Sequence, residues 1–388
     1  MGLGTAAMEV LELNPAAGFG GAYRGKRVLV TGHTGFKGSW LCIWLRMLGA
    51  EVTGFALPPA TPEDNFVLSG LRDKLEHIEG DIRDAAALQA AFDRCRPDVV
   101  FHLAAQPIVR LSYAQPLETL QTNVIGTANL LECLRKAPGP VAAVLIASDK
   151  CYENREQLWG YRETDPLGGH DPYSASKGCA ELVAACWQRS FFDPQHYPQH
   201  RKAVATVRAG NVIGGGDWSP DRILPDCIRA LRAGQVIQLR NPQAVRPWQH
   251  VLEPLYGYLL LGRRLLEQGP AFGGAWNFGP DLEATCTVGR LVEQLVALWG
   301  SGSWATPPQQ NAPHESTLLA LDCTKAKSLL GWRPCLPLHK ALAYTIEWYR
   351  CCESGDTEAL CRRQITDYLA QMAQAQGSAA PRQKEARP

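Results

Sequence analysis

The sequence predicts an α/β fold: a doubly wound parallel sheet of the Rossmann type, joined to a smaller C-terminal α/β domain. From residue 25 to about 208, short apolar runs rich in β-branched residues alternate with helical segments. This alternation is typical of a parallel sheet covered by helices on both faces. A glycine-rich loop also stands directly between the first apolar run and the first helical segment.

The first half of the chain provides these elements in order. Strands are expected at residues 27–30, 51–55, 99–103 and 144–147, with another ending near Gly80 and Asp81. Helices are expected at residues 39–48, 85–95 and 123–135, and Asp84 is placed to cap the second of them. A further helix over residues 173–187 follows Asp171-Pro172, a favourable helix start.

The pattern changes after about Arg208, where glycines and prolines separate shorter elements and helices are expected at 288–299 and 339–349. We therefore divide the chain into a loose leader (1–24, with Met8 as an alternative start), a sheet domain (25–208), a mainly substrate-binding domain (209–373) and a polar tail (374–388). Residues of about 245–280 either stay in the second domain or return to the sheet.

Composition excludes several classes of protein. The 388 residues are 46% hydrophobic and 20% charged, which favours a large core over global disorder. The formal net charge of +1 offers no broad field for nucleic acid or a membrane surface. No apolar run reaches about 18 residues, and no signal-peptide pattern is present. Thirteen cysteines without zinc spacing indicate reduced thiols, no metal site and a cytoplasmic location.

The glycine loop Thr31-Gly32-His33-Thr34-Gly35-Phe36-Lys37-Gly38 predicts dinucleotide binding. Its G-x-x-G-x-x-G spacing provides a tight turn, and the helix that follows presents backbone N–H groups to a pyrophosphate. We therefore expect Gly32, Thr34, Gly35, Phe36, Lys37 and Gly38 at the cofactor. The second strand ends in Phe55-Ala56-Leu57, without an acid for a ribose hydroxyl or an arginine for a 2′-phosphate, so these residues leave NAD and NADP open.

The strand that ends near Asp81 and the strand at 99–103 are expected to end at the same edge of the sheet as the glycine loop. Asp81 is suited to accept a hydrogen bond from the adenine amino group beside the backbone of Ile82, or alternatively to cap the next helix. The small residues of Leu103-Ala104-Ala105-Gln106 let a cofactor lie across the sheet edge. His102 lies within the apolar strand and is interpreted as a core residue with its hydrogen bonds satisfied.

The chemical centre is predicted from two segments. In Tyr173-Ser174-Ala175-Ser176-Lys177, tyrosine and lysine four residues apart share a helix face. A nearby ammonium, together with a bound nicotinamide cation, favours the phenolate and lowers the pKa of Tyr173, so Tyr173 can take a proton from a sugar hydroxyl while hydride leaves the same carbon. Ser148-Asp149-Lys150 follows the fifth strand and places an acid and a base candidate at the same edge; the alternative is a solvated turn with a surface ion pair.

These segments resemble a known family. TGHTGFKGSWL, FHLAAQPIVRLSY, SDKCYENRE, YRETDPLGGHDPYSASKGCAELV, RAGNVIGGGDW and RPWQHVLEPL are similar to the sugar-nucleotide dehydratases of the extended short-chain dehydrogenase/reductase family, over about residues 25–370. Relatives that act on dTDP-glucose carry Asp-Glu where this chain has Asp149-Lys150. That departure favours the branch that acts on CDP-sugars.

The resemblance implies an internal redox cycle on CDP-glucose with NAD as cofactor, giving CDP-4-keto-6-deoxyglucose for deoxysugar and polysaccharide synthesis. It implies that Tyr173, Ser148 and Lys177 act at C4, that Asp149 protonates the departing C6 hydroxyl, and that Asn123 belongs to the cofactor site. Lys150 takes the place of the C5 base, either as a neutral amine or as a cation that stabilises an enolate. A homodimer through a four-helix bundle, formed by the helices at 123–135 and 173–187, is also implied.

The sugar-nucleotide side is expected in the second half. Asn211 is a candidate for the substrate diphosphate, and glycines 214–216 allow a close backbone approach. Arg246 fits a diphosphate clamp because a guanidinium forks onto phosphate oxygens. The complete set expected at the substrate is Gln106, Arg110, Asn211, Gly216, Arg222, Arg240, Arg246 and His250. For single arginines the alternative is a surface salt bridge, and Trp218 and Trp248 either stack on a ligand or pack in the core.

Two alternative functions stay open. An epimerase or reductase of the same fold needs the Tyr173 and Lys177 pair but no acid/base pair for elimination, so Asp149 and Lys150 distinguish it. A dinucleotide sensor without catalysis is the other alternative, and the presence of both Tyr173 and Lys177 argues against it.

Overall fold

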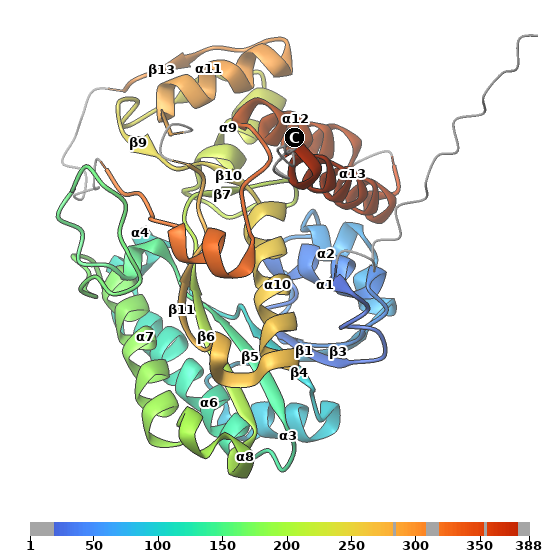
Figure 1. The fold of residues 1–388 in the computed structure, drawn as a ribbon. Coiled ribbons are helices and arrows are strands. Elements are labelled where there is room, and N and C mark those ends of the chain that lie inside the picture. Colours follow the sequence, from blue (N-terminus) through green and yellow to red (C-terminus); the bar gives the residue numbers. More distant parts are fainter. Residues whose placement is uncertain (1–18, 282–284, 308–317, 353–354, 379–388) are drawn as a thin grey trace, which may run out of the picture.

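The computed structural model describes residues 19–281, 285–307, 318–352 and 355–378. At its centre lies a seven-stranded parallel sheet with the strand order β11-β6-β5-β4-β1-β2-β3 (Figure 1). The strands of this sheet are β1 (Arg27–Thr31), β2 (Glu51–Ala56), β3 (Glu76–Glu79), β4 (Val99–His102), β5 (Val141–Ile146), β6 (Lys202–Arg208) and β11 (Gly274–Asn277). Because β2 and β3 extend the sheet to one side of β1 and β4 to β6 extend it to the other, the topological switch point lies between β1 and β4. Ligands of such sheets bind beyond the carboxyl ends of the strands at this point.

The helices divide between the sheet and an upper layer. The first half contains α1 (Phe36–Met47), α2 (Asn65–Leu68), α3 (Ala85–Cys95), α4 (Val109–Ala114), α5 (Pro116–Leu120), α6 (Gly126–Lys136), α7 (Pro172–Ser190) and α8 (Tyr197–His200). The second half contains α9 (Ile223–Arg232), α10 (Leu252–Gln268), α11 (Val288–Trp299), α12 (Leu338–Cys351) and α13 (Thr357–Ser378).

Each face of the sheet is covered by its own set of helices. Val28 and Val30 of β1 belong to the apolar cluster that α1 and α10 complete, whereas Leu29 belongs to the cluster beneath α3 and α6. Helix α6 packs against both α3 and α7. Because both faces are buried, the strands carry continuous apolar runs rather than an alternation of apolar and polar residues. The predicted doubly wound parallel sheet is confirmed.

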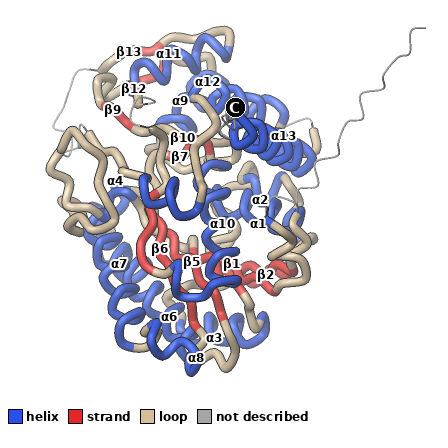
Figure 2. The backbone as a smooth tube through the Cα atoms, in the orientation of Figure 1, coloured by secondary structure: helices blue, strands red, loops and turns tan. Residues whose placement is uncertain are grey.

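After β6 the chain builds a smaller layer above the carboxyl ends of the sheet (Figure 1). This layer contains the parallel pairs β7 (Val212–Ile213) with β10 (Gln249–His250) and β8 (Ile237–Gln238) with β13 (Trp304–Ala305), and the antiparallel pair β9 (Val245–Arg246) with β12 (Cys286–Thr287). Between these pieces the chain returns to the large sheet: α10 packs against β5, and β11 forms the edge strand beside β6. Figure 2 shows the red strands of the large sheet in the lower half, with long tan loops above and beside them.

Most predicted elements lie within three residues of the observed ones, and the differences have local causes. The helix predicted from residue 39 already begins at Phe36, because the glycine loop itself forms its N-terminus at Gly35. The strand predicted from residue 144 begins at Val141, whose N–H donates to the carbonyl of Arg201 at 3.1 Å. The helix predicted over 123–135 is α6, and a π-helical turn at Gln121–Ile125 precedes it.

The two predicted chain ends need correction. Residues 1–18 of the expected loose leader lie outside the described residues, but Phe19 and Tyr23 are buried in the core. The Tyr23 hydroxyl donates to the carbonyl of Leu259 at 2.7 Å, which anchors this segment to α10. The many small residues of the leader concealed these two anchors. At the other end, α13 continues to Ser378, beyond the predicted start of the tail at residue 374.

No helix in the described ranges has the length and apolar character needed to cross a bilayer. The thirteen cysteines are free thiols, and most are buried.

Candidate active site

The glycine loop lies at the carboxyl end of β1 and leads directly into α1. Gly32 has φ = +73°, and a Cβ there would approach the backbone nitrogen of Ala104 to 2.7 Å. A Cβ at Gly38 would overlap the carbonyl oxygen of Gly32. Glycine at these positions lets the loop lie against the end of β4 and leaves the first N–H groups of α1 at the edge of the sheet. This cradle fits the pyrophosphate of a dinucleotide.

Neighbouring residues hold the loop in place. The Thr34 hydroxyl donates to the carbonyl of Leu57 at 2.9 Å, which ties the loop to the end of β2. Phe36 lies beneath Gly214, where a Cβ would come within 2.9 Å of the Phe36 ring. The loop is therefore supported by the sheet on one side and by the second half of the chain on the other.

The helix that carries Tyr173 begins as the sequence predicts. The Asp171 carboxylate accepts hydrogen bonds from the Ser174 N–H at 2.9 Å and from the Ser174 hydroxyl at 2.6 Å. The N–H of Tyr173 donates to the buried Ser112 hydroxyl at 3.1 Å, and Ser112 donates to the carbonyl of Val109 at 2.6 Å. Helix α4 thereby fixes the first turn of α7.

Tyr173 and Lys177 are both buried, one turn apart, beside the end of β5. The Lys177 ammonium lies 3.5 Å from the carbonyl oxygen of Ile146, the last residue of β5. Burial lowers the pKa of Lys177 to about 8. Burial also raises the pKa of Tyr173 to about 12, and a hydrogen bond with Ser148 and the charge of Arg222 oppose this rise. Burial therefore outweighs these opposing effects. The expectation that Lys177 and a bound nicotinamide cation together lower the pKa of Tyr173 stays a prediction.

Ser148, Asp149 and Lys150 form one tight turn directly after β5. The Ser148 hydroxyl donates to Oδ1 of Asp149 at 3.0 Å and accepts from the N–H of Lys150 at 3.2 Å. Asp149 is only 3% exposed, and its Oδ2 has no hydrogen-bond partner among the residues that the structure describes. The alternative of a solvated turn is wrong for Ser148 and Asp149, because both are buried. A buried carboxylate oxygen without a partner is costly and is typical of a reactive site.

Lys37 links the glycine loop electrostatically to this turn. It is partly buried, and desolvation together with the charge of Arg222 lowers its pKa to about 8. Asp149 and Asp217 act in the opposite direction, and Lys177 adds to the lowering. Charged groups from both halves of the chain therefore act on one another at the carboxyl edge of the sheet.

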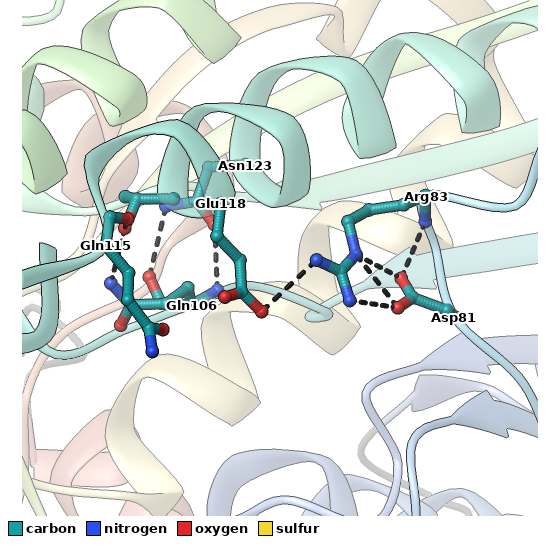
Figure 3. A network of polar contacts seen from close by, with 7 residues as sticks. Asp81, Arg83, Gln106, Gln115, Glu118 and Asn123 are labelled. Carbon is teal, nitrogen blue, oxygen red and sulfur yellow. Dashed lines mark hydrogen bonds and ion pairs between the residues drawn. The ribbon is translucent and has the colours of Figure 1, made fainter.

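Asn123 organises the loop that follows β4. Its Oδ1 accepts from the Gln106 N–H at 2.8 Å, and its Nδ2 donates to the Gln106 carbonyl at 3.1 Å (Figure 3). The same Nδ2 donates to the Ser176 hydroxyl at 2.8 Å, which joins the loop to α7. The Gln106 side chain donates to Thr119 at 2.8 Å and accepts from the N–H of Ile108 at 2.5 Å. Both polar atoms of the Gln106 side chain are thus engaged within the chain.

Leu103, Ala104 and Ala105 follow β4 and are partly buried, and the two alanines have small side chains. The N–H of Leu103 donates to the carbonyl of Thr31 at 3.0 Å, and Ala104 donates to the Thr31 hydroxyl at 3.3 Å; Ala105 follows without a bulky side chain. His102 lies between the hydroxyls of Thr31 at 2.7 Å and Thr127 at 3.1 Å. Burial lowers the pKa of His102 to about 3, so its interpretation as a satisfied core residue is confirmed.

Asp81 follows β3 and pairs with Arg83, two residues later in the chain. Its carboxylate lies 2.5 Å from Arg83, which also reaches Glu118 of α5 at 3.2 Å (Figure 3). This contact with Arg83 lowers the pKa of Asp81. The helix-cap alternative for Asp81 is wrong, because Asp84 provides the cap of α3. The side chain of Ile82 is buried, so its backbone is the part that remains at the sheet edge.

Three of the expected substrate arginines gather around the segment 217–222. Arg110 and Arg240 both pair with Asp221, at 3.4 Å and 3.1 Å, and Arg222 pairs with Asp217 at 2.9 Å. The side chains of Arg110 and Arg240 are 40% and 43% exposed. Three guanidinium groups thus meet two carboxylates, which leaves an excess of positive charge suited to phosphate oxygens.

Asn211 and Arg246 lie partly buried on two further segments. Asn211 has φ = +43°, a left-handed conformation that asparagine tolerates better than most residues, and its carbonyl accepts from the N–H of Gln249 at 3.2 Å. Arg246 lies in β9, and its guanidinium donates to the carbonyl of Val245 at 2.9 Å.

The glycines at 214–216 are explained by packing within the chain. A Cβ at Gly215 would overlap the ring of Trp348, and a Cβ at Gly216, where φ is +79°, would overlap Asn65. We expected the substrate to approach the backbone closely at Gly216. In the structure, Asn65 and Trp348 of the chain itself occupy that position. Trp218 is also buried and packs edge-on against Tyr349, in agreement with the core alternative.

The expectation that His250 contacts the substrate is also wrong. It is fully buried, and the rings of Trp40 and Tyr344 lie edge-on to it at centroid distances of 6.0 Å and 5.7 Å. Burial lowers the pKa of His250 to about 3. Because aromatic rings cover it, His250 is not available to a substrate. Trp248, two residues earlier, is buried as well.

Several residues of this region were missed at the level of sequence. Asp217 and Asp221, which receive the arginines, stand in the segment GGGDWSPDR, and their spacing after the glycines was the available signal. Ser112, which anchors Tyr173, carries no recognisable spacing relative to its partner. Only the folded chain brings them together.

The chain is similar in sequence to known 4,6-dehydratases of sugar nucleotides. Residues 29–345 match the family model described as GDP-mannose 4,6 dehydratase. The curated CDP-glucose 4,6-dehydratase of Salmonella typhimurium is 50% identical over 348 residues, which span 89% of this chain and 97% of that protein.

Solved structures provide two further relatives. The dTDP-glucose 4,6-dehydratase of Streptomyces venezuelae, solved with NAD bound, has a TM-score of 0.70 at 27% identity and covers 84% of this chain and 97% of its own. The UDP-glucose 4-epimerase of Thermotoga maritima, solved with UDP-glucose, has a TM-score of 0.67 at 25% identity and covers 83% of this chain and 98% of its own.

Proposed function

This chain belongs to the GDP-mannose 4,6 dehydratase family, and on that premise we propose that it is a hydro-lyase that uses NAD to convert CDP-glucose into CDP-4-keto-6-deoxyglucose and water. The observation that carries the proposal is the 50% identity to a CDP-glucose 4,6-dehydratase along 97% of that protein. The burial of Ser148, Asp149, Tyr173 and Lys177 at one end of the sheet supports it.

The proposed reaction removes water without net oxidation. Bound NAD would supply the acceptor for the C4 hydrogen and its electron pair and the donor of the same hydrogen to C6, and its positive nicotinamide ring would favour the phenolate of Tyr173. The ketone at C4 acidifies the C5 hydrogen, and the C5 proton and the C6 hydroxyl leave as water. A solvent proton replaces the one lost from C5, so atoms and electrons balance.

Tyr173 takes the proton of the C4 hydroxyl. To accept this proton Tyr173 has to be a phenolate; burial raises its pKa, and the positive charges of a bound nicotinamide and of the Lys177 ammonium would oppose that rise. The Ser148 hydroxyl hydrogen-bonds the same sugar oxygen, and Lys177 holds the ribose hydroxyls of the cofactor. Both roles suit buried groups whose positions are fixed by β5 and α7.

Asp149 and Lys150 carry the elimination. Asp149 donates a proton to the departing C6 hydroxyl through its carboxyl group. Lys150, the next residue of the same turn, acts at C5. It serves either as a neutral base or as a cation that stabilises the enolate, and an arginine at this position separates these roles because arginine keeps the charge but cannot take the proton.

The first half of the chain binds the cofactor, and the second half binds most of the sugar nucleotide. The cofactor lies on the sheet domain of residues 25–208, along the glycine loop and the ends of β3 and β4. The sugar nucleotide lies mainly on residues 209–373, where Arg222 and Arg240, together with Arg110 from the first half, bind the diphosphate. Helix α10 and strand β11 belong to the second half in sequence but complete the sheet.

We also propose a homodimer through a four-helix bundle, formed by α6 and α7 of each copy, with α5 beside them. Helix α7 packs against α5 and α6. Leu117 of α5, Ile125 just before α6, Leu182 of α7 and Phe191 just after α7 are 73%, 52%, 55% and 45% exposed. Four large apolar side chains on adjacent helices favour burial against a second copy. Light scattering should give twice the chain mass, and Leu182→Glu should reduce it to a single chain; a wild-type monomer would contradict the dimer.

The proposed function is tested by incubating the purified protein with NAD and, separately, CDP-glucose, dTDP-glucose and UDP-glucose, followed by mass analysis of the products. We expect the loss of one water from CDP-glucose in preference to the other two. An unchanged mass with an inverted C4 would indicate an epimerase. NAD binding without reaction on any of the three would indicate a dinucleotide sensor.

A further inference from the structure

Gln249 stands in the motif RPWQHV, and the proposed reaction gives it no role. It is the first residue of β10, which pairs with β7 above the carboxyl ends of β6 and β11 (Figure 1). The residue is only 3% exposed. Because buried polar groups are nearly always hydrogen-bonded, the partners of this amide show what it holds in place.

The side-chain amide of Gln249 donates to two backbone carbonyls. Its Nε2 lies 3.2 Å from the carbonyl oxygen of Gly210, which follows β6, and 3.0 Å from that of Phe278, which follows β11. Only the nitrogen end of an amide can donate to two carbonyls, so the partners determine this orientation. The amide therefore joins the ends of two neighbouring strands of the large sheet.

The oxygen of the same amide indicates a role beyond packing. Oε1 of Gln249 has no hydrogen-bond partner among the described residues. An apolar side chain of similar length would avoid the cost of burying this oxygen. The two hydrogen bonds that Nε2 donates are therefore what distinguishes glutamine from an apolar residue at this position.

The carbonyl that Gln249 holds at β6 belongs to the residue that contacts Asp149. A Cβ on Gly210 would overlap Oδ2 of Asp149, so the backbone of Gly210 limits where this carboxyl group can lie. The main-chain N–H of Gln249 also donates to the carbonyl of Asn211 at 3.2 Å, and Asn211 has a left-handed φ of +43°. One residue thus fixes two successive carbonyls of the turn beside Asp149.

We propose that Gln249 is a positioning residue for the elimination step, because its side-chain amide fixes Gly210 and Gly210 in turn confines the Asp149 carboxyl group. The inference rests on the proposed dehydratase function, in which Asp149 protonates the departing C6 hydroxyl. Without the amide, Gly210 can move and the carboxyl group can turn away from the sugar. Oxidation at C4 depends on Tyr173, which α7 and Ser112 hold in place, so this step continues.

The kinetic test compares Gln249→Met with Gln188→Met. Gln188 of α7 also donates through its side-chain amide to a carbonyl of β6, that of Val204 at 2.9 Å, so it is a matched control earlier in the same strand. We expect Gln249→Met to lower kcat for CDP-glucose about 10- to 100-fold, with a smaller change in KM. The absorbance of reduced nicotinamide should build up during turnover, because oxidation continues while elimination slows. Equal loss of oxidation and elimination, or a rate equal to that of Gln188→Met, would overturn the proposal.

Gln249→Asn is a milder variant for the case in which Gln249→Met does not fold. It keeps the amide but shortens its reach by one methylene group, so the amide can no longer span both carbonyls. We expect the same build-up of reduced nicotinamide with a smaller loss of kcat. Absence of this build-up in every folded variant of Gln249 would overturn the proposal.

A further test needs no activity. Gly210→Ala places a methyl group against Asp149, and the backbone can shift to relieve this overlap only when the amide of Gln249 releases it. In a double-mutant cycle by urea unfolding, Gly210→Ala should therefore cost less stability in a Gln249→Asn background than in the wild type, but no less in a Gln188→Asn background. Additivity of Gly210→Ala with Gln249→Asn would overturn the inference. If the wild-type protein fails to dehydrate CDP-glucose, the proposed function fails, and the cycle still decides whether Gln249 holds Gly210.

Discussion

Asp149 and Gly210 are in direct contact: the Oδ2 oxygen of the carboxylate occupies the space that a β-carbon on Gly210 would take. Asp149 follows β5 and Gly210 follows the neighbouring strand β6, so the contact joins two strand ends at the carboxyl edge of the sheet. A side chain at position 210 and the observed position of Asp149 exclude each other. Glycine at this position is therefore part of the proposed elimination machinery.

Gly210→Ala should abolish most of the dehydration. The added methyl group displaces the Asp149 carboxyl group, and misplacing a general acid costs about 10²-fold or more in rate. Binding of NAD, measured by calorimetry, should be unchanged because the glycine loop is untouched. Gly139→Ala is the control, since a Cβ there meets no atom within 4 Å. Wild-type turnover of Gly210→Ala would show that Asp149 has no role in the reaction.

Lys150→Met should bind NAD and oxidise C4 but lose elimination, because it removes both the amine and the charge at C5. Lys150→Arg distinguishes the two roles proposed for this lysine. If the lysine stabilises an enolate, the arginine variant should keep measurable turnover; if it is the base, the arginine variant should be as inactive as Lys150→Met. The measurement is product formation from CDP-glucose, and undiminished turnover of Lys150→Met would refute both roles.

Asn123→Ala should destabilise the protein by about 2 kcal/mol, because it leaves the N–H and carbonyl of Gln106 without their partner and removes the hydrogen bond to the Ser176 hydroxyl. Urea unfolding measures the change. Gln121→Ala provides the comparison, since Gln121 is exposed and lies two residues earlier in the same helical segment. Equal stability of the two variants would mean that the loop after β4 does not depend on Asn123.

Glu253 should make the stability of the protein depend on pH. This buried carboxyl group accepts from the backbone of Cys335 at 2.8 Å and Leu336 at 2.6 Å and from the Tyr368 hydroxyl at 2.9 Å. Burial nevertheless raises its pKa from 4.5 to about 7. Its contribution to stability is therefore complete below about pH 4.5 and is lost as the pH rises through about 7.

This pH dependence is measured by comparing the wild type with Glu253→Gln, which lacks the titrating carboxyl group. Between pH 4.5 and 8 the free energy of unfolding of the wild type should fall by up to about 3 kcal/mol relative to that of Glu253→Gln. Urea unfolding at several pH values compares the two proteins. Parallel curves for wild type and variant would show that Glu253 is not the responsible group.

Features that depend on residues close together in the sequence were predictable, and contacts between distant segments were not. The glycine loop, the cap at Asp84 and the helix start at Asp171 depend on neighbours within a few residues, and all three occur as predicted. The burial of His250 between Trp40 and Tyr344 depends on three separate segments, so its sequence motif pointed wrongly to the substrate. The pKa of Tyr173 depends on burial by the whole fold, which residue spacing does not express.

The most direct test of the proposed reaction follows one hydrogen atom. The protein is incubated with NAD and CDP-glucose that carries deuterium at C4, in ordinary water, and the product is examined by mass spectrometry and NMR. Internal transfer predicts deuterium at C6 and a solvent hydrogen at C5 in a product that has lost one water. Deuterium that remains at C4 of a product of unchanged mass, or that is lost to solvent, would contradict the dehydratase cycle.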